Sequence, residues 1–349
     1  MNNDRLANAL MRAWLRRGWL ARLLWPLSAL YAALLACRRA FYQLGWLQQR
    51  SLPVPVIVVG NIFVGGTGKT PLVIWLLEQL ALAGYRPGVI SRGYGGTNAG
   101  TMLVTDNALA SEVGDEPLLI ARQTRCPVAV GRDRYEAGAA LLQKFPTLDV
   151  LVADDGLQHL ALQRDIEVVL FDSRGVGNGW VLPAGPLREP VARVRDFTVI
   201  NLNTADSPDA ALGSTFYRMQ LTGASAWQLS SPAQIRPIAS FADGRKVLAA
   251  AGIGNPDRFF AMLHQQGLQT ATLALPDHFD FATNPFAQVN ADIILITEKD
   301  AVKCRQSGEI AADPRIWVVK AEVSVAGGLA AAVLEKLEQR RANRESPIT

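Results

Sequence analysis

The 349-residue sequence predicts an α/β fold with a mostly parallel, doubly wound sheet, a second and smaller Rossmann-like lobe, and a membrane-associated helix at the N-terminus. Three observations lead to this class. Apolar runs of strand length alternate with helical segments along most of the chain. The first of these runs ends in a glycine-rich turn, and an arginine- and tryptophan-rich segment precedes it. We expect four regions, which span residues 1–50, 51–204, 205–240 and 241–349.

The first region, residues 1–50, is expected to attach to one leaflet of a membrane. It contains eight arginines and one acidic residue, a net charge of +7, whereas the rest of the chain carries a net charge of −3. Its uncharged run, residues 23–37, would span about 22 Å as a helix, which is shorter than the roughly 30 Å hydrocarbon core. Arginines flank this run and four tryptophans lie nearby. Both residue types favour the membrane–water boundary, so we expect a monotopic segment.

Three alternatives stay open for this segment: a buried core helix, a true membrane span and a secretory signal. The signal is disfavoured because the apolar run starts late and ends at Arg38 and Arg39. Because the basic charge is confined to one segment, it indicates a local anionic surface and no nucleic-acid partner. The three cysteines form no CxxC pair and the three histidines are scattered, which argues against a disulfide framework or a metal cluster of these residue types.

The second region opens with a phosphate-binding loop, a P-loop, between an apolar strand at 54–60 and a helix at 69–84. Lys69 can reach terminal phosphates, and the Thr70 hydroxyl can hold Mg²⁺. The strict pattern G-x-x-x-x-G-K-T requires glycine where this chain has Phe63, and a glycine-rich turn with an unrelated lysine is the alternative. The sequence predicts that ATP and Mg²⁺ bind here, with nucleotide contacts from Phe63, Val64, Gly65, Gly66, Thr67, Gly68, Lys69 and Thr70.

A second signature, "DVLVADDGLQH" at 149–159, is an apolar strand that ends in two carboxylates. In a doubly wound sheet, the carboxyl ends of the strands converge on the ligand crevice. We therefore expect Asp154 and Asp155 to lie beside the P-loop and hold Mg²⁺, with Gln158 on the same turn as a further metal-binding residue. A helix cap or turn is the alternative role for this pair.

The remaining elements follow from the same periodicity. Residues 205–240 are rich in turn residues, and we expect them to connect two lobes and to contain a two-stranded piece, "TFYRMQL" and "AWQL". In the first lobe we expect strands at 54–60, 86–91, 126–130, 149–154, 166–171 and 197–202, and helices at 69–83, 115–124 and 131–144. In the second lobe we expect strands at 246–251, 292–297 and 315–320, and helices at 256–266 and 325–342.

Eight short motifs, taken together and in this order, resemble the tetraacyldisaccharide 4'-kinases, the lipid A 4'-kinases of Gram-negative bacteria. The motifs are "GNIFVGGTGKTP", "SRGYGG", "GDEP", "GRDR", "DDGLQH", "LPAGPLREP", "PDHFDF" and "TEKDAVK". The resemblance implies transfer of the ATP γ-phosphate to the 4'-hydroxyl of tetraacyldisaccharide 1-phosphate, which gives lipid IVA at the cytoplasmic face of the inner membrane. It also implies two lobes that close over a cleft, and no obligate protein partner is inferred.

The resemblance also implies roles for individual residues. It makes Asp115 in "GDEP" the catalytic base and His278 in "PDHFDF" its partner, whereas the sequence alone favours a helix N-cap for Asp115. It implies that Glu189 joins the metal shell through water. Arg92, Arg132 and Arg134 are candidates for phosphate contacts on either substrate, and surface salt bridges are their alternative role.

Two rival functions remain. One is a membrane-associated ATPase switch of the partitioning type, whose loop normally carries a lysine where this chain has Val64. Such a switch releases free phosphate, whereas a kinase makes a phosphorylated lipid. The other rival is a soluble small-molecule kinase, in which the N-terminal segment would be a core helix.

Overall fold

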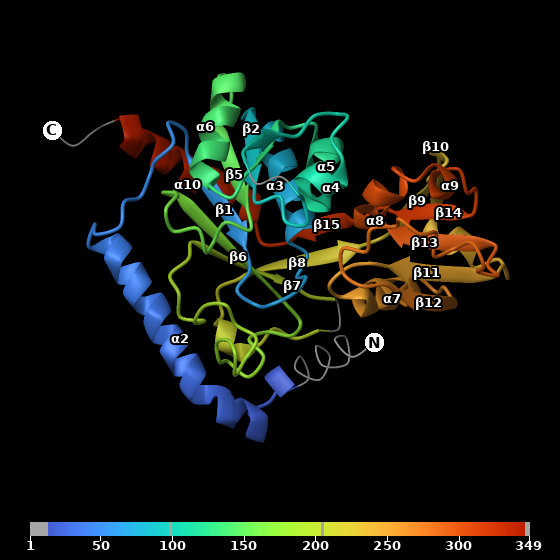
Figure 1. Ribbon diagram of the computed structural model, residues 1–349, viewed down its shortest axis with the longest axis horizontal. Helices are drawn as coiled ribbons and strands as arrows, with labels where there is room; N and C mark the ends of the chain where they lie inside the picture. Colours follow the sequence, from blue (N-terminus) through green and yellow to red (C-terminus); the bar gives the residue numbers. More distant parts are fainter. Residues whose placement is uncertain (1–12, 98–99, 204–205, 346–349) are drawn as a thin grey trace.

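The computed structural model describes residues 13–97, 100–203 and 206–345, so the first twelve residues of the expected membrane segment lie outside the described residues. Two β-sheets, each covered by helices, lie side by side along the long axis of the molecule, and a long helix runs along the outside of the larger lobe (Figure 1). The α/β class and the two lobes predicted from the sequence are confirmed.

The larger sheet has nine strands in the order β15-β8-β7-β6-β1-β5-β2-β4-β3. All neighbouring pairs are parallel except β15 with β8 and β3 with β4. Its strands are β1 (Val56–Gly60), β2 (Pro87–Ser91), β3 (Met102–Leu103), β4 (Val128–Val130), β5 (Val150–Asp154), β6 (Ile166–Asp172), β7 (Phe197–Asn201), β8 (Tyr217–Thr222) and β15 (Glu322–Val325). Its helices are α3 (Lys69–Leu82), α4 (Ala110–Val113), α5 (Asp115–Thr124), α6 (Arg134–Lys144) and α10 (Leu329–Glu345), and a 3₁₀ turn spans Ala210–Leu212.

The central strand β1 shows why the sheet is doubly wound. All five of its residues are buried. Val56 and Val58 pack in one apolar layer with residues of α6, whereas Ile57 and Val59 pack in the opposite layer with residues of α3 and α10. Successive side chains on a strand point to opposite faces, so a continuous apolar run is what a strand covered on both faces requires.

The smaller sheet has six strands in the order β10-β9-β14-β13-β11-β12. The four strands from β14 to β12 are parallel, and β9 and β10 add two antiparallel strands at one edge. Its elements are β9 (Ser225–Gln228), β10 (Ser231–Pro237), β11 (Val247–Ala251), α7 (Pro256–Gln265), β12 (Thr270–Ala274), β13 (Ile293–Thr297), α8 (Glu298–Cys304), α9 (Gly308–Ala311), β14 (Ile316–Val319) and a 3₁₀ helix at Ile238–Phe241. The edge strand β12 was not expected, because its partly exposed residues do not form an apolar run.

Two expectations about the connections are wrong. "TFYRMQL" and "AWQL" do not pair with each other: β8 extends the larger sheet and β9 belongs to the smaller one. The C-terminal part of 241–349 does not stay in the second lobe, because β15 pairs with β8 and α10 packs on α3 and β6. The chain therefore passes between the lobes twice, after β8 and after β14. Gly223 lies in the first passage, where an added Cβ would be 2.7 Å from Met262 and 2.8 Å from Val319, so there is no room for a side chain.

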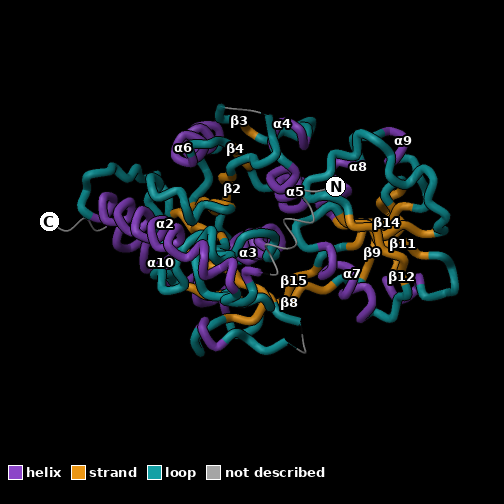
Figure 2. The backbone as a smooth tube through the Cα atoms, turned by 60° about the horizontal axis from the view of Figure 1, so that its bottom comes forward, coloured by secondary structure: helices purple, strands orange, loops and turns teal. Residues whose placement is uncertain are grey.

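The N-terminal helix α2 (Trp19–Gln43) lies against the larger lobe (Figure 2). Ala21 and Ser28 are its buried residues. Its 25 residues would extend about 37 Å, and in the described residues it is the one helix long and apolar enough to cross a membrane. Only 11% of its most apolar stretch is buried, and that stretch has a mean hydropathy of 1.6. This exposure argues against the buried core helix and makes α2 a candidate for membrane association. Its large exposed apolar side chains are Trp19, Leu23, Trp25, Leu27, Leu30, Leu34 and Phe41.

Candidate functional site

The P-loop and the paired carboxylates meet at the carboxyl ends of β1 and β5. These strands are parallel neighbours, and Val59 lies opposite Asp154 in their register. The backbone N–H of Asp155 donates to the carbonyl of Val59 at 2.9 Å. The expected convergence of the two motifs on one edge of the sheet is therefore present in the structure.

The loop is held in shape by Asn61, which is fully buried. Its amide nitrogen donates to the carbonyls of Phe63 and Gly65 at 2.6 and 3.1 Å, and its amide oxygen accepts from the Lys69 ammonium at 3.1 Å. Gly65 and Gly68 adopt φ angles of 98° and 95°, which glycine tolerates best. Asn61 was present in the quoted motif "GNIF" but was given no role, because its contacts appear only when the loop folds back.

The predicted nucleotide residues fall into two groups. Phe63 is 1% exposed and its ring lies beneath the Arg174 guanidinium, so its side chain belongs to the core. Thr67 and Thr70 are also buried, at the end of the loop and in the first turn of α3. The backbone of Gly65, Gly66 and Gly68, together with the Val64 amide that donates to the carbonyl of Pro186, completes the loop.

Each of the two carboxylates has one oxygen atom without a hydrogen-bond partner. Asp154 accepts a hydrogen bond from the Ser91 hydroxyl at 3.3 Å through one oxygen, and its other oxygen is buried without a partner. Asp155 forms an ion pair with Arg188 at 3.3 Å, and its second oxygen lies 3.7 Å from the Lys69 ammonium without a hydrogen bond. Burial raises the pKa of Asp154 to about 7, and the charges of Glu116 and Asp155 act in the same direction.

These unpaired oxygens fit Mg²⁺, a hard cation that binds one or two carboxylates and completes its shell with phosphate and water oxygens. Thr70, a buried residue at the start of α3, adds a hydroxyl oxygen to the two carboxylates as a candidate ligand. No group of three or more His, Cys, Asp or Glu side chains suited to a metal occurs in the part of the chain that the structure describes. A cation that shares its shell with phosphates does not need such a group.

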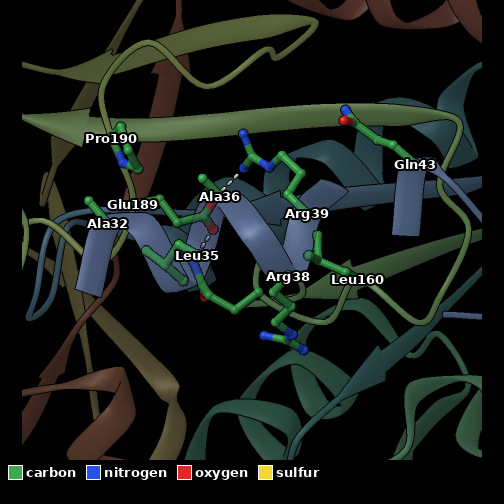
Figure 3. Close-up of a pocket in the computed structure, with 10 residues that line it drawn as sticks. Ala32, Leu35, Ala36, Arg38, Arg39, Gln43, Leu160, Glu189 and Pro190 are labelled. Carbon is green, nitrogen blue, oxygen red and sulfur yellow. Dashed lines mark hydrogen bonds and ion pairs between the residues drawn. The ribbon is translucent and has the colours of Figure 1, made fainter. Parts of the chain in front are cut away.

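Gln158 and Glu189 lie together beneath α2. Gln158 donates to Glu189 at 2.9 Å. Arg39 of α2 forms an ion pair with Glu189 at 2.6 Å, and Figure 3 shows these two side chains pointing toward each other. Arg193 lies 3.5 Å from the same carboxylate. In the described residues, no hydrogen bond or ion pair joins Gln158 or Glu189 to Thr70 or the two aspartates. Their metal role stays a prediction, and the two residues line a cavity of about 300 Å³ under the helix.

The three predicted phosphate-binding arginines differ in position. Arg92 and Arg132 are exposed, which suits contact with an incoming anion. Arg134 is 3% exposed and donates to the carbonyls of Gly131 and Asp155, at 2.9 and 3.5 Å. Burial lowers the pKa of Arg134 to about 10, although the charges of Asp154 and Asp155 oppose this shift. Arg134 thus holds the backbone of the turn that carries Asp155, and its contact with a substrate phosphate remains a prediction.

Sequence reasoning missed the residues of both lobes that contact the P-loop from outside it. Arg258 of α7 donates to the amide oxygen of Asn201, and the amide nitrogen of Asn201 donates to the Thr67 carbonyl at 3.0 Å. Arg174 donates to the Gly66 carbonyl at 3.0 Å. Gly254 lies so close to the loop that a Cβ there would be 3.0 Å from the Gly66 nitrogen. Because these contacts link elements far apart in the chain, no local pattern indicates them.

Asp115 and His278 meet across the two lobes, although 163 positions separate them. The Nδ1 atom of His278 lies 3.0 Å from both oxygens of Asp115. Asp115 is the first residue of α5 and is 4% exposed, and the N-cap is Gly114, so the N-cap role considered for Asp115 is wrong. His278 has a φ of 61°, an uncommon angle for this residue type, and its ring lies 5.2 Å from that of Tyr94.

The electrostatic surroundings keep the Asp115 carboxylate charged. Burial alone would raise the pKa of Asp115. The hydrogen bond to His278 and the charges of Lys299 and Lys303 outweigh burial and hold this pKa well below its ordinary value. The site therefore contains an ionised, hydrogen-bonded carboxylate at the lobe interface, which meets the requirement that a proton acceptor be deprotonated.

Comparisons with known proteins agree with this geometry. A family model described as tetraacyldisaccharide-1-P 4'-kinase matches residues 20–338. The chain is 56% identical over 345 residues to a tetraacyldisaccharide 4'-kinase of Janthinobacterium sp. (strain Marseille), which covers 97% of this chain and 99% of the relative. It is 54% identical over 338 residues to the protein of that name from Herminiimonas arsenicoxydans, with 93% and 94% covered. The solved structure of LpxK from Aquifex aeolicus in complex with ATP matches with a TM-score of 0.77 and 29% identity, over 91% of this chain and 99% of that one.

Proposed function

Because the chain belongs to the tetraacyldisaccharide-1-P 4'-kinase family, we propose that it transfers the γ-phosphate of ATP to the 4'-hydroxyl of tetraacyldisaccharide 1-phosphate and so produces lipid IVA. The observation that carries this proposal is the meeting of three features in one molecule. They are a P-loop beside two carboxylates, the Asp115–His278 pair at the lobe interface, and the exposed apolar helix α2.

The P-loop side of the site binds the donor. The amides of the loop and the Lys69 ammonium would neutralise the phosphates of ATP, the ligand present in the Aquifex aeolicus relative. Thr70, Asp154 and Asp155 would hold Mg²⁺, with Gln158 and Glu189 as candidates for contacts through water. When bound, the cation neutralises charge that develops on the transferred phosphoryl group. Lys69 acts with it as the catalytic cation of the loop.

Asp115 acts as the base on the acceptor side. The 4'-oxygen attacks the γ-phosphorus, ADP leaves, and the hydroxyl proton passes to the Asp115 carboxylate. His278 donates to that carboxylate through Nδ1 and orients it. Arg92 and Arg132, which are exposed, would contact substrate phosphates, and Arg134 would fix the carboxylate turn.

Helix α2 attaches the protein to the membrane in which the lipid substrate lies. Its exposed apolar residues and flanking arginines support a monotopic position in one leaflet, where arginines contact lipid phosphates. ATP is available in the cytosol, so we place the protein at the cytoplasmic face of the inner membrane. The lipid substrate and this membrane surface are the partners that the proposal needs.

Substitution of Asp115 tests the proposed chemistry. In Asp115→Asn the base loses its charge but keeps its shape, so ATP should still bind while lipid phosphorylation falls by about 10²-fold or more. His278→Ala should lower turnover more than ATP affinity. Both are measured by ATP binding and by lipid phosphorylation in micelles. Near-normal turnover of Asp115→Asn would remove Asp115 as the base.

A further inference from the structure

Two lysines of α8 reach from the second lobe to the catalytic pair. Lys299 and Lys303 are four residues apart, so they lie on the same face of the helix. The Lys303 ammonium lies 3.2 Å from Oδ2 of Asp115, and the Lys299 ammonium lies 3.9 Å from the same atom. Their side chains are 9% and 15% exposed, so water screens these interactions little. Both belong to the motif "TEKDAVK", to which the proposed chemistry assigns no role.

The charges at this interface are mixed and close together. Besides Asp115, the Lys299 ammonium faces Glu116 of α5 at 3.1 Å and Asp277 at 3.4 Å. Burial opposes the charge of Lys299, but Glu116, Asp277 and Asp115 outweigh burial and raise the pKa of Lys299 above its ordinary value. Lys299 is thus a permanently charged group in the cluster. Without the two lysines, the hydrogen bond from His278 would have to oppose the effect of burial on the Asp115 pKa without their help.

Lys299 also faces the other nitrogen of the catalytic histidine. Its ammonium lies 3.5 Å from Nε2 of His278. An ammonium donates and cannot accept, so Nε2 is the acceptor in this contact. The Asp277 carboxylate lies 3.8 Å from Nε2 and acts in the opposite sense, but Lys299 also pairs with that carboxylate at 3.4 Å. The ring proton of the neutral imidazole then resides on Nδ1, where it points to the Asp115 carboxylate 3.0 Å away. The position of Lys299 therefore selects the tautomer in which His278 donates to Asp115.

We propose that Lys303 and Lys299 are positioning residues for the Asp115–His278 pair: Lys303 keeps the Asp115 carboxylate ionised and aimed, and Lys299 fixes the Nδ1-protonated tautomer of His278. This inference rests on the proposed role of Asp115 as base. Because the lysines come from the second lobe and Asp115 from the first, the pair is complete only when α8 packs on α5. In phosphoryl transfer with a loose transition state, placement and charge of the acceptor matter more than strong basicity.

The first experiment measures lipid phosphorylation against pH for the full chain in detergent micelles. Lys303→Met should lower kcat about 10-fold or more near neutral pH, which is less than the full contribution of a positioned base. The KM for ATP should stay within about twofold of the parent's. Asp115 stays ionised near neutral pH, so the loss of kcat reflects lost positioning, and the acid limb should move to higher pH because the pKa of Asp115 rises when an opposite charge is removed. Lys303→Arg should restore most of the activity.

A matched control separates this effect from the loss of any paired lysine. Lys336 on α10 forms an ion pair with Asp196 at 2.5 Å on the larger lobe, so Lys336→Met removes a more exposed lysine–carboxylate pair that is not part of the cluster. Its pH profile should match that of the parent protein. A pH profile of Lys303→Met that superimposes on the parent's, with ATP binding intact, would overturn the role of Lys303.

The second experiment observes the tautomer directly and does not depend on turnover. The chain has three histidines, so ¹⁵N-histidine spectra can be assigned with His159→Gln and His264→Gln variants. His278 should show a protonated Nδ1 in the parent protein, and Lys299→Met should shift the ring toward a mixture of tautomers. A parent spectrum with the proton on Nε2, or an unchanged tautomer in Lys299→Met, would overturn the role of Lys299.

Asp115→Asn in the same assay separates the proposed role of Asp115 as base from the positioning role of the two lysines. If Asp115→Asn turns over normally, the proposed base is wrong. If Asp115→Asn is inactive while both lysine variants keep the parent's pH profile and tautomer, the base stands and the positioning role of the lysines is wrong.

Discussion

At the scale of single residues, two buried asparagine side chains hold the backbone of the P-loop through hydrogen bonds. Asn61 and Asn201 are both fully buried, and each donates to a carbonyl of the P-loop. The loop and the carboxylate pair could be predicted from their residues, because glycine, lysine and aspartate at those spacings have a chemical meaning of their own. The asparagines could not, because a buried amide is explained only by the partners that the fold brings to it.

Asn201→Ala tests this residue-scale account. It removes the donor to the Thr67 carbonyl and the acceptor for Arg258 in a buried place, so the free energy of unfolding should fall by about 1–3 kcal/mol. ATP affinity should fall several-fold because the loop loses a support. Asn107→Ala, at an exposed position, is the control. Unfolding free energy and ATP affinity equal to the parent's would show that Asn201 does not hold the loop.

At the scale of elements, the sequence pattern predicted helix α2 but not its full length or its contacts with the larger lobe. The arginine-flanked apolar run correctly indicated a helix with exposed apolar side chains. Its length was underestimated, because the uncharged run is only the central part of a 25-residue helix that continues through Arg38 and Arg39. Its docking on the larger lobe, through Ser28 to the Val181 carbonyl and through Arg39 to Glu189, depends on partners that no helical periodicity reveals.

The native cysteines offer a test of the position of α2. Cys37 is exposed on this helix, whereas burial raises the thiol pKa of both Cys126 and Cys304 and so disfavours their reactive thiolates. A polarity-sensitive maleimide should therefore label Cys37 first. Its emission should shift to the blue when anionic vesicles are added, because the probe enters the interface with the helix.

The control for this measurement carries the probe on another surface. In a Cys37→Ser, Lys144→Cys variant the label sits at the exposed end of α6, and its emission should not change with vesicles. An unchanged emission from the Cys37 label in vesicles to which the protein binds would contradict attachment through α2.

At the scale of the whole molecule, two α/β lobes meet around the P-loop. The alternation of apolar strands and helices was enough to predict both lobes. It could not predict that β15 and α10 return to the first sheet, because an antiparallel edge strand and a C-terminal helix have the same local pattern in either lobe. The contact between Asp115 and His278 was expected only through the family resemblance, since neither residue stands in a chemical motif of its own.

The central claim is that this two-lobed protein phosphorylates a lipid and does not simply hydrolyse ATP. The most direct test incubates the purified full chain with γ-labelled ATP, Mg²⁺ and tetraacyldisaccharide 1-phosphate in detergent micelles and then separates the lipids. We expect label in a bis-phosphorylated lipid and none with Lys69→Ala, because the P-loop lysine neutralises the transferred phosphoryl group. Label found only in free phosphate, with a folded protein and an unchanged lipid, would contradict the kinase and favour an ATPase switch.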